Sequence, residues 1–368
     1  MIWTGLRAIL GLWAAWSLLA CAALLLGRVV QGPQLALSQA DGALVLYDPV
    51  QRLRITPFHD SASYTRPRWS PDGGSLLIFS DRADQNRRQA GLYRWVLGER
   101  LQEIAGLDGL PGFVSAPPEW SPDGQQIALL LFIGDASGRS HQLFAYTLAD
   151  GALIPLSQAE TLRQATPFAW TTEGALRYLL QLGSLFAIEE ARPGQPPQRL
   201  RTWDTVFHSS SGAALLAPDG ARFVIAARLA ADAPEQVFLF DLDSGGIQAL
   251  SDNSGAETPL AWSADGQLLL LKRRAANEAL ELVIVEVATR TRRSLLRANA
   301  WTDWPQGAAL DIGGLRWSAD GQQIAFFRHW LDRSGRSARA DLCLMRATDA
   351  VPDCTHDSVW NEDAAWKP

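Results

Sequence analysis

A five-residue signature, Trp-Ser-Pro/Ala-Asp-Gly, recurs along this 368-residue chain at intervals of roughly fifty residues, each time just before an apolar run. Four copies are complete. Two altered copies begin at Trp170 and Leu216, and a fragment at Trp366 ends the chain. The tryptophans, acids and glycines that define this repeat are Trp69, Asp72, Gly73, Trp120, Asp123, Gly124, Trp170, Gly174, Asp219, Gly220, Trp262, Asp265, Gly266, Trp317, Asp320, Gly321 and Trp366.

The residue types of the repeat indicate short antiparallel strands. A tryptophan buries a large flat ring between neighbouring sheets. Asp-Gly favours a tight hairpin turn, because glycine tolerates positive φ and aspartate bonds nearby backbone amides. The apolar runs that follow, such as 76–79 and 324–327, are typical of strands buried on both faces. Weaker third and fourth segments complete each unit, and four strands every forty to fifty residues are typical of a propeller blade.

The two chain ends are expected to share a blade. Residues 34–58 resemble a unit without its first strand, and 364–366 supply a strand without a unit. Pairing them would close the ring and protect exposed strand edges. The sequence therefore predicts an all-β fold, a seven-bladed β-propeller closed by both ends, with six blades as the alternative.

This repeat resembles that of the TolB-like propeller family and, more loosely, that of WD-repeat propellers. The resemblance covers roughly residues 34–368. It implies a ring of blades, often closed by a shared blade. TolB itself has a six-bladed ring behind a separate α/β domain, whereas this chain has seven repeats and no such domain before the first strand. Many unrelated roles use the scaffold, so the resemblance predicts the fold and not the function.

A long apolar segment precedes the repeats. Residues 8–27 carry no charge and lie between Arg7 and Arg28, and a run of that length can span a bilayer. We therefore divide the chain into a membrane anchor, 1–30, and a propeller, 31–368. A cleaved signal peptide and a lipoprotein acylated at Cys21 are the alternatives.

Two cysteines are placed to form a disulfide. Cys343 and Cys354 flank a predicted hairpin, and a two-residue turn at 348–349 would set them opposite one another. Two unrelated thiols are the alternative. A bridge would place the propeller on the extracytoplasmic side of the membrane.

Charge and motifs limit the function. The net charge of −6, from 33 basic and 39 acidic residues, offers no field for nucleic acid. No nucleophile elbow, zinc helix, phosphate loop or Cys-x-x-Cys pair occurs, so we expect no catalytic residue, metal or cofactor. The acids of the repeat are explained by turn geometry. A hydrolase or lyase acting on a peptide or glycan is the alternative, with His59, His208 and Glu257 near the entrances of inner strands.

The connections that enter each inner strand form the predicted binding surface, because they converge on the central mouth. The longest, 299–314, holds Trp301, Asp303, Trp304 and Asp311, an aromatic and acidic set that favours peptide or sugar recognition. Packing of both tryptophans between blades is the alternative. The other candidates for the mouth are Tyr64, Arg66, Phe113, Glu119, Phe168, Trp203, Glu257, Arg316, Trp360, Glu362 and Asp363. We expect a membrane-tethered, non-enzymatic module that binds a protein or peptide of the cell envelope.

Overall fold

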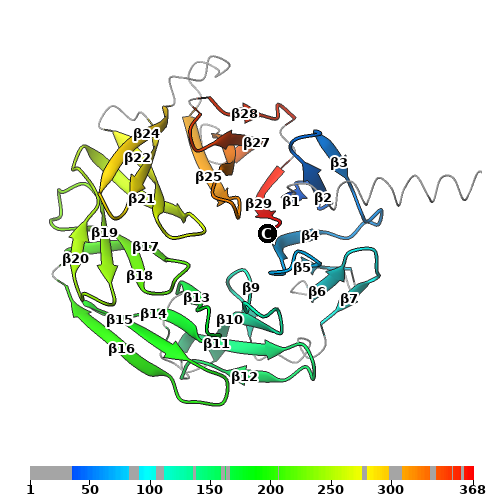
Figure 1. The fold of residues 1–368 in the computed structure, drawn as a ribbon, viewed down its shortest axis with the longest axis horizontal. Coiled ribbons are helices and arrows are strands. Elements are labelled where there is room, and N and C mark those ends of the chain that lie inside the picture. The colour runs from blue at the N-terminus through cyan, green and yellow to red at the C-terminus, as the bar shows by residue number, and fades with distance from the viewer. Residues whose placement is uncertain are drawn as a thin grey trace, which may run out of the picture.

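Seven antiparallel sheets surround a central axis in the described part of the chain, as seen in the computed structural model (Figure 1). The structure describes residues 35–82, 91–104, 112–135, 138–158, 162, 166–205, 207–275, 280–297, 309–331, 337–349, 351–357 and 360–368. Each sheet is one blade, and its strands follow one another outward from the axis. The predicted seven-bladed, all-β architecture is confirmed, and the six-bladed alternative is not.

The blades are numbered along the chain. Blade 1 is β4 (Tyr64–Trp69), β5 (Ser75–Ser80), β6 (Gly91–Val96) and β7 (Leu101–Glu103), and blade 2 is β8 (Phe113–Val114), β9 (Glu119–Trp120), β10 (Gln126–Asp135), β11 (Gly138–Thr147) and β12 (Leu153–Pro155). Blade 3 is β13 (Phe168–Trp170), β14 (Leu176–Leu182), β15 (Leu185–Ala191) and β16 (Gln198–Asp204), and blade 4 is β17 (Ser209–Leu216), β18 (Arg222–Arg228), β19 (Gln236–Asp241) and β20 (Ile247–Ala249). Blade 5 is β21 (Gly255–Trp262), β22 (Leu268–Ala275), β23 (Leu280–Glu286) and β24 (Thr291–Arg297), and blade 6 is β25 (Ala309–Trp317), β26 (Gln323–Leu331), β27 (Ser337–Arg346) and β28 (Asp353–Cys354). Blade 7 is β29 (Trp360–Trp366), β1 (Leu35–Gln39), β2 (Leu44–Asp48) and β3 (Leu53–Ile55).

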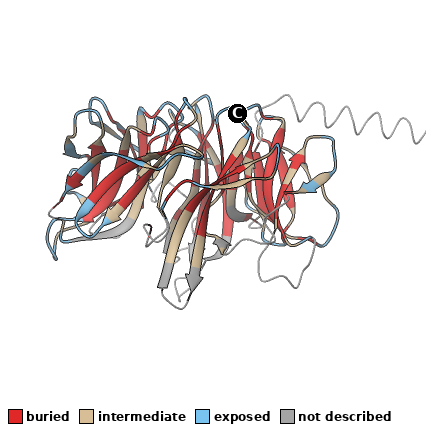
Figure 2. Cartoon of the chain, turned by 90° about the horizontal axis from the view of Figure 1, so that it is seen from below, coloured by how far each residue is buried: buried red, intermediate tan, exposed pale blue. Residues whose placement is uncertain are grey.

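The outermost strands of the blades are the least buried, and Figure 2 colours each residue by its burial. All six residues of β5 are buried, whereas all three of the outermost β20 are exposed. The core lies between blades rather than inside one sheet. Phe186 of blade 3, for example, packs in one cluster with Phe223 and Phe240 of blade 4. The continuous apolar runs therefore form strands that neighbouring blades cover on both faces.

The motif turn is closed by its serine and its aspartate. In blade 1 the Ser70 hydroxyl accepts the Ser75 N–H at 2.8 Å and donates to Asp72 Oδ1 at 2.6 Å. Asp72 Oδ1 also accepts the Gly74 N–H at 2.9 Å. Gly73 has φ +65°, a conformation that glycine adopts without steric cost. The same serine-to-aspartate bond recurs at Ser121–Asp123, Ser263–Asp265 and Ser318–Asp320.

Five motif tryptophans donate a hydrogen bond to the preceding blade. The Trp120 indole N–H donates to the carbonyl of Arg68, the residue just before the motif of blade 1, at 3.2 Å. In blade 4 the tryptophan is replaced by Leu216, whose side chain cannot donate a hydrogen bond. The equivalent bonds are Trp69 to Ala365, Trp170 to Glu119, Trp262 to Leu215 and Trp366 to Arg316, at 3.1–3.4 Å. Tryptophan therefore supplies a directional link as well as buried area.

Blade 7 is built from both ends of the chain. β29 pairs with β1 in antiparallel register, with Leu35 opposite Trp366 and Leu37 opposite Ala364. Figure 1 shows β29, in red, beside the blue strands β1 and β2. The predicted shared-blade closure is thus confirmed.

The predicted anchor, residues 1–30, lies outside the described residues, as does Cys21. From Leu35 onward, the described part of the chain contains no helix with the length and apolar character needed to cross a membrane.

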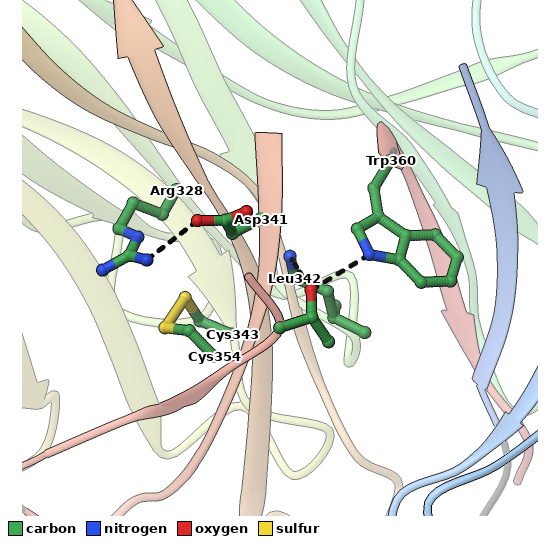
Figure 3. The surroundings of a disulfide bond; sticks show 7 residues. Arg328, Asp341, Leu342, Cys343, Cys354 and Trp360 are labelled. Carbon is green, nitrogen blue, oxygen red and sulfur yellow. Dashed lines mark hydrogen bonds and ion pairs between the residues drawn. A yellow bond between two sulfur atoms is a disulfide. The ribbon is translucent and has the colours of Figure 1, made fainter. Parts of the chain in front are cut away.

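Cys343 and Cys354 form a disulfide between β27 and β28 (Figure 3). They lie directly opposite in the ladder, as the sequence predicts. The hairpin itself differs from the prediction, since β27 ends at Arg346 and β28 begins only at Asp353, a connection longer than two residues. Beside the bridge, the buried Arg328 donates to Asp341 at 2.8 Å.

Candidate functional site: the central channel

A cavity of about 520 Å³ lies on the axis of the ring. Its lining includes Pro122, Pro218 and Ala264, each of which is the third residue of a motif turn. The cavity therefore lies where the inner strands end, opposite the predicted mouth where the inner strands begin. Its lining residues are Glu119, Trp120, Pro122, Phe168, Ala169, Trp170, Leu215, Leu216, Pro218, Leu260, Ala261, Trp262, Ala264, Leu315, Arg316 and Trp317.

One position of the repeat decides the chemistry of this cavity. The residue just before the motif's first position lines the cavity in blades 2 to 6, because the pleat turns that residue towards the axis while the next one packs between blades. These residues are Glu119, Ala169, Leu215, Ala261 and Arg316. Blades 3, 4 and 5 therefore present an apolar wall, and blades 2 and 6 present charge.

Arg316 is the main cation of the channel. Its guanidinium Nη1 donates to the Leu315 carbonyl at 2.9 Å. Burial, assisted by the nearby Arg68 cation, lowers the pKa of Arg316 to about 10, although the Glu119 and Asp363 carboxylates oppose this shift. Arg316 thus remains protonated at neutral pH, and its charge is incompletely compensated.

Arg68 occupies the equivalent position in blade 1. Its side chain is mostly buried, with Nε 3.5 Å from Glu119 Oε1 and Nη1 donating to the Pro67 carbonyl at 2.9 Å. Glu119 is about half exposed, so the ion pair is a weak one. Blades 6, 7, 1 and 2 therefore supply a charged arc opposite the apolar wall.

Asp363 completes the charged arc and is held by the backbone of Arg66. The Arg66 backbone N–H donates to Asp363 Oδ2 at 3.2 Å, and its guanidinium lies 5.7 Å from the Phe79 ring centre. Arg66 has φ +52°, an uncommon value for a residue other than glycine. This strain accompanies a register shift in β4 between Thr65 and Arg68.

The structure brings together part of the predicted binding set. Glu119, Phe168 and Arg316 line the cavity, and Asp363 lies near Arg316. The Arg66 guanidinium instead donates to the Val114 carbonyl at 3.5 Å. The predicted loop residues Trp301, Asp303 and Trp304 lie outside the described residues, as do the side chains of Phe113 and Glu362. Their proposed role stays a prediction.

Other predicted residues have structural partners away from the cavity. Tyr64 is buried and donates to the Asp60 carboxylate, and burial raises its pKa well above the usual range. Asp311 pairs with Lys272 at 2.9 Å. Glu257 is fully buried and paired with Arg292 of the same blade.

Two predicted tryptophans also lie outside the cavity. Trp203 is in β16, the outermost strand of blade 3, and donates to the Gly245 carbonyl at 3.0 Å. Its expected place at the mouth is therefore corrected: it links the outer edges of blades 3 and 4. Trp360 in β29 donates to Asp357 at 2.9 Å.

Sequence reasoning missed Arg68 and the position that it shares with Arg316. The signal was present in the repeats, because aligning the copies places Arg68, Glu119 and Arg316 in a single column before the tryptophan. The sequence analysis placed the binding surface on the connections that enter the inner strands, which lie at the opposite end of these strands.

A second cavity of about 450 Å³ lies between blades 6 and 7 and includes Arg52, Arg54 and Cys354. The charge of Arg54, the main cation of this second cavity, is already neutralised by a carboxylate. Arg54 pairs with Asp357 at 2.5 Å and lies 4.9 Å from the Trp360 ring centre. The central channel, with fewer internal partners for its arginines, is therefore the better candidate site.

The described part of the chain holds no cluster of three or more His, Cys, Asp or Glu side chains able to bind a metal. His59 and His208, which belong to the enzymatic alternative, are exposed, while Glu257 is enclosed with Arg292. These three residues therefore do not form a joint site.

No protein-family model matches this chain. A stretch of 77 residues, 21% of the chain, is 38% identical to an uncharacterized peptidase, YuxL, of Bacillus subtilis, and spans 11% of that protein. The matched stretch is thus a small part of the relative.

Solved structures with similar folds include an oligogalacturonate lyase in complex with manganese, at 12% identity over 87% of this chain and 83% of that chain, with a TM-score of 0.53. One of two prolyl endopeptidases has the same TM-score at 15% identity, over 81% of this chain and 42% of that chain. TolB from Acinetobacter baumannii matches at 18% identity and a TM-score of 0.44, over 71% of this chain and 62% of that chain. At these identities the likeness concerns the propeller fold alone.

Proposed function

We propose that this chain is a non-enzymatic binding module whose central channel receives a segment of a peptide or protein. The observation that carries the proposal is the two-sided lining of the cavity. An apolar wall from blades 3 to 5 faces a charged arc that contains Arg316. Such a combination of apolar surface and a few convergent polar groups is typical of a ligand site.

The volume of the cavity also suits a short segment. About 520 Å³ falls within the range of about 300–1,000 Å³ that ligand sites occupy. Recognition of a whole protein would then use a terminus or a loop that enters the ring, together with contacts on its rim.

Site-specific photo-crosslinking tests this proposal. A benzoylphenylalanine at Ala261 would lie in the channel, and one at Ile247, in the exposed outer strand β20, is the matched control. We expect a discrete polypeptide adduct in cells from the Ala261 position and none from the Ile247 position. The same adducts from both positions, or none from Ala261, would contradict the proposal.

A hydrolase or lyase is the second candidate, and the short stretch of identity to an uncharacterized peptidase favours it. A panel of peptide and glycan substrates, tested with and without added Mn²⁺, decides between the two. Turnover that is lost in His59→Ala or His208→Ala would overturn the binding proposal in favour of an enzyme.

We further propose that the propeller is tethered to a membrane on its extracytoplasmic side. The uncharged segment 8–27 and the cysteine pair support this location. Alkaline carbonate should leave the full chain in the membrane pellet and release a chain that begins at residue 31. Release of both chains would contradict the tether.

A further inference from the structure

The channel arginines have more donors than acceptors. A guanidinium carries about five N–H donors, and among the described residues Arg316 has a single acceptor, the Leu315 carbonyl. Among the described side chains, no carboxylate lies within ion-pair distance of Arg316. Arg292, in contrast, pairs with both Glu257 and Asp252. Arg316 is therefore an enclosed cation with free hydrogen-bonding capacity beside a cavity.

A second guanidinium, that of Arg68, adds to the positive charge beside the cavity. Arg68 is close enough to Arg316 to disfavour its protonated form. Two enclosed like charges destabilise the fold unless an opposite charge compensates them. Glu119 and Asp363 supply part of this charge, but Glu119 is 47% exposed and 3.5 Å from Arg68, and neither carboxylate lies within ion-pair distance of Arg316. A carboxylate that enters the cavity would therefore reach Arg316, which lines it, with the Arg68 cation close behind Glu119.

The apolar wall limits which anion fits. Phe168, Leu215 and Leu260 line the same cavity as Arg316. An inorganic anion would leave this wall in contact with water, whereas an amino-acid residue can place a carboxylate on Arg316 and an apolar neighbour against the leucines.

We propose that the central cavity binds a carboxylate of an extended peptide through Arg316, with the Arg68 cation adding positive charge nearby and an adjacent apolar side chain packed against Leu215 and Leu260. The proposal rests on the proposed binding function and names the chemistry of its ligand. The carboxylate comes from a chain terminus or from an acidic side chain. Arginine suits both, because its planar fork matches the two carboxylate oxygens.

Three fluorescein-labelled hexapeptides test the proposal by fluorescence anisotropy with the full chain in detergent micelles. One ends in Gly-Ser-Leu with a free carboxylate, the second is its neutral amide, and the third is an amide ending in Gly-Asp-Leu. We expect at least one of the two charged peptides to bind about tenfold more tightly than the neutral one, equivalent to about 1.4 kcal/mol. The tighter of the two identifies the source of the carboxylate.

Substitutions then assign the preference to the channel. Arg316→Gln should reduce the charged-to-neutral ratio below about threefold, and Arg316→Lys, which keeps the charge but not the fork, should give an intermediate ratio. The matched control is Arg201→Gln in the outer strand β16, which should keep the full ratio. Thermal melts establish that each variant is folded, and the peptide comparison on the unaltered chain needs no variant.

Equal binding of all three peptides would overturn the carboxylate site and leave the binding function standing. The site is also wrong if no peptide binds, or if Arg316→Gln keeps the full ratio. Crosslinking from Ala261 tests the binding function separately, so the two failures are distinguishable.

Discussion

At the scale of single residues, the tryptophan of the repeat performs two tasks. Its ring fills the gap between blades, and its indole N–H bonds to the preceding blade. Trp317 lacks the second contact, because its Nε1 is buried with no partner among the described atoms. Trp120 and Trp317 are equally buried, at 8% and 9% exposure, so the pair separates hydrogen bonding from packing.

Trp120→Phe should therefore destabilise the protein more than Trp317→Phe. The first change leaves the Arg68 carbonyl without its donor, at a cost of about 1–3 kcal/mol, while the second removes a donor that is unsatisfied already. Urea unfolding of the two variants measures the difference. Equal losses of stability would show that the indole bonds contribute nothing.

The motif aspartates predict a loss of stability in acid. A hydrogen bond from the motif serine, followed by one from a backbone N–H, lowers the folded-state pKa of Asp72, Asp123, Asp265 and Asp320 below 3.8. A carboxyl group with a lowered folded-state pKa stabilises the fold at every pH above its unfolded-state pKa. This stabilisation is lost as the pH falls through the folded-state pKa. The urea concentration at the unfolding midpoint should therefore decrease as the pH is lowered below about 4.

The Asp123→Asn variant provides the comparison, because its amide does not ionise. At pH 7 this variant should unfold at a lower urea concentration than the unaltered chain. Between pH 5 and pH 3 its urea midpoint should decrease by less than that of the unaltered chain. A midpoint that is independent of pH in this range would contradict the prediction.

At the scale of elements, the last strand matters more than its length suggests. β29 supplies the innermost strand of blade 7, and Trp366 donates to the Arg316 carbonyl of blade 6 at 3.2 Å. Trp69 of blade 1 donates to Ala365 in return. One short strand thus joins three blades.

Deleting residues 362–368 should destabilise the fold by at least about 3–5 kcal/mol, the usual cost of removing one large buried aromatic side chain. That is a large part of a typical domain stability of about 5–15 kcal/mol. Calorimetry would show a much lower Tm. Removing only 367–368, which follow β29, is the control and should have a smaller effect. A truncated chain that melts at the original temperature would refute the closure.

At the scale of the whole molecule, the disulfide connects the structure to the cellular compartment. Cys343 is fully buried and bonded to Cys354 across an edge of blade 6. Bridges of this kind persist in oxidising compartments and are rare in the cytoplasm. The redox state of the pair in cells therefore reports on whether the propeller lies in an oxidising compartment, as the proposed extracytoplasmic location requires.

Protein that is alkylated during cell lysis and then denatured without reductant should show Cys343 and Cys354 protected from labelling. The bridge closes a short loop, so Cys343→Ser with Cys354→Ser should cost about 3 kcal/mol. Labelling of both thiols in freshly lysed cells would contradict the extracytoplasmic location.

The sequence by itself determined the repeat architecture. The Trp-Ser-Pro/Ala-Asp-Gly turns, the apolar runs after them and the split repeat at the two ends predicted seven blades and their closure, because each of these signals depends on local backbone chemistry. The opposition of Cys343 and Cys354 followed from the same strand spacing.

Only the tertiary structure decided which side chains meet on the axis. Arg68, Glu119 and Arg316 lie in three different repeats, and their proximity depends on how far the ring rotates from blade to blade. The placement of Trp203 at an outer edge, and of the cavity beside the motif turns, likewise depended on packing between blades. Sequence periodicity specifies each blade, but the geometry between blades specifies the site, because contacts across the ring join residues that no local signal relates.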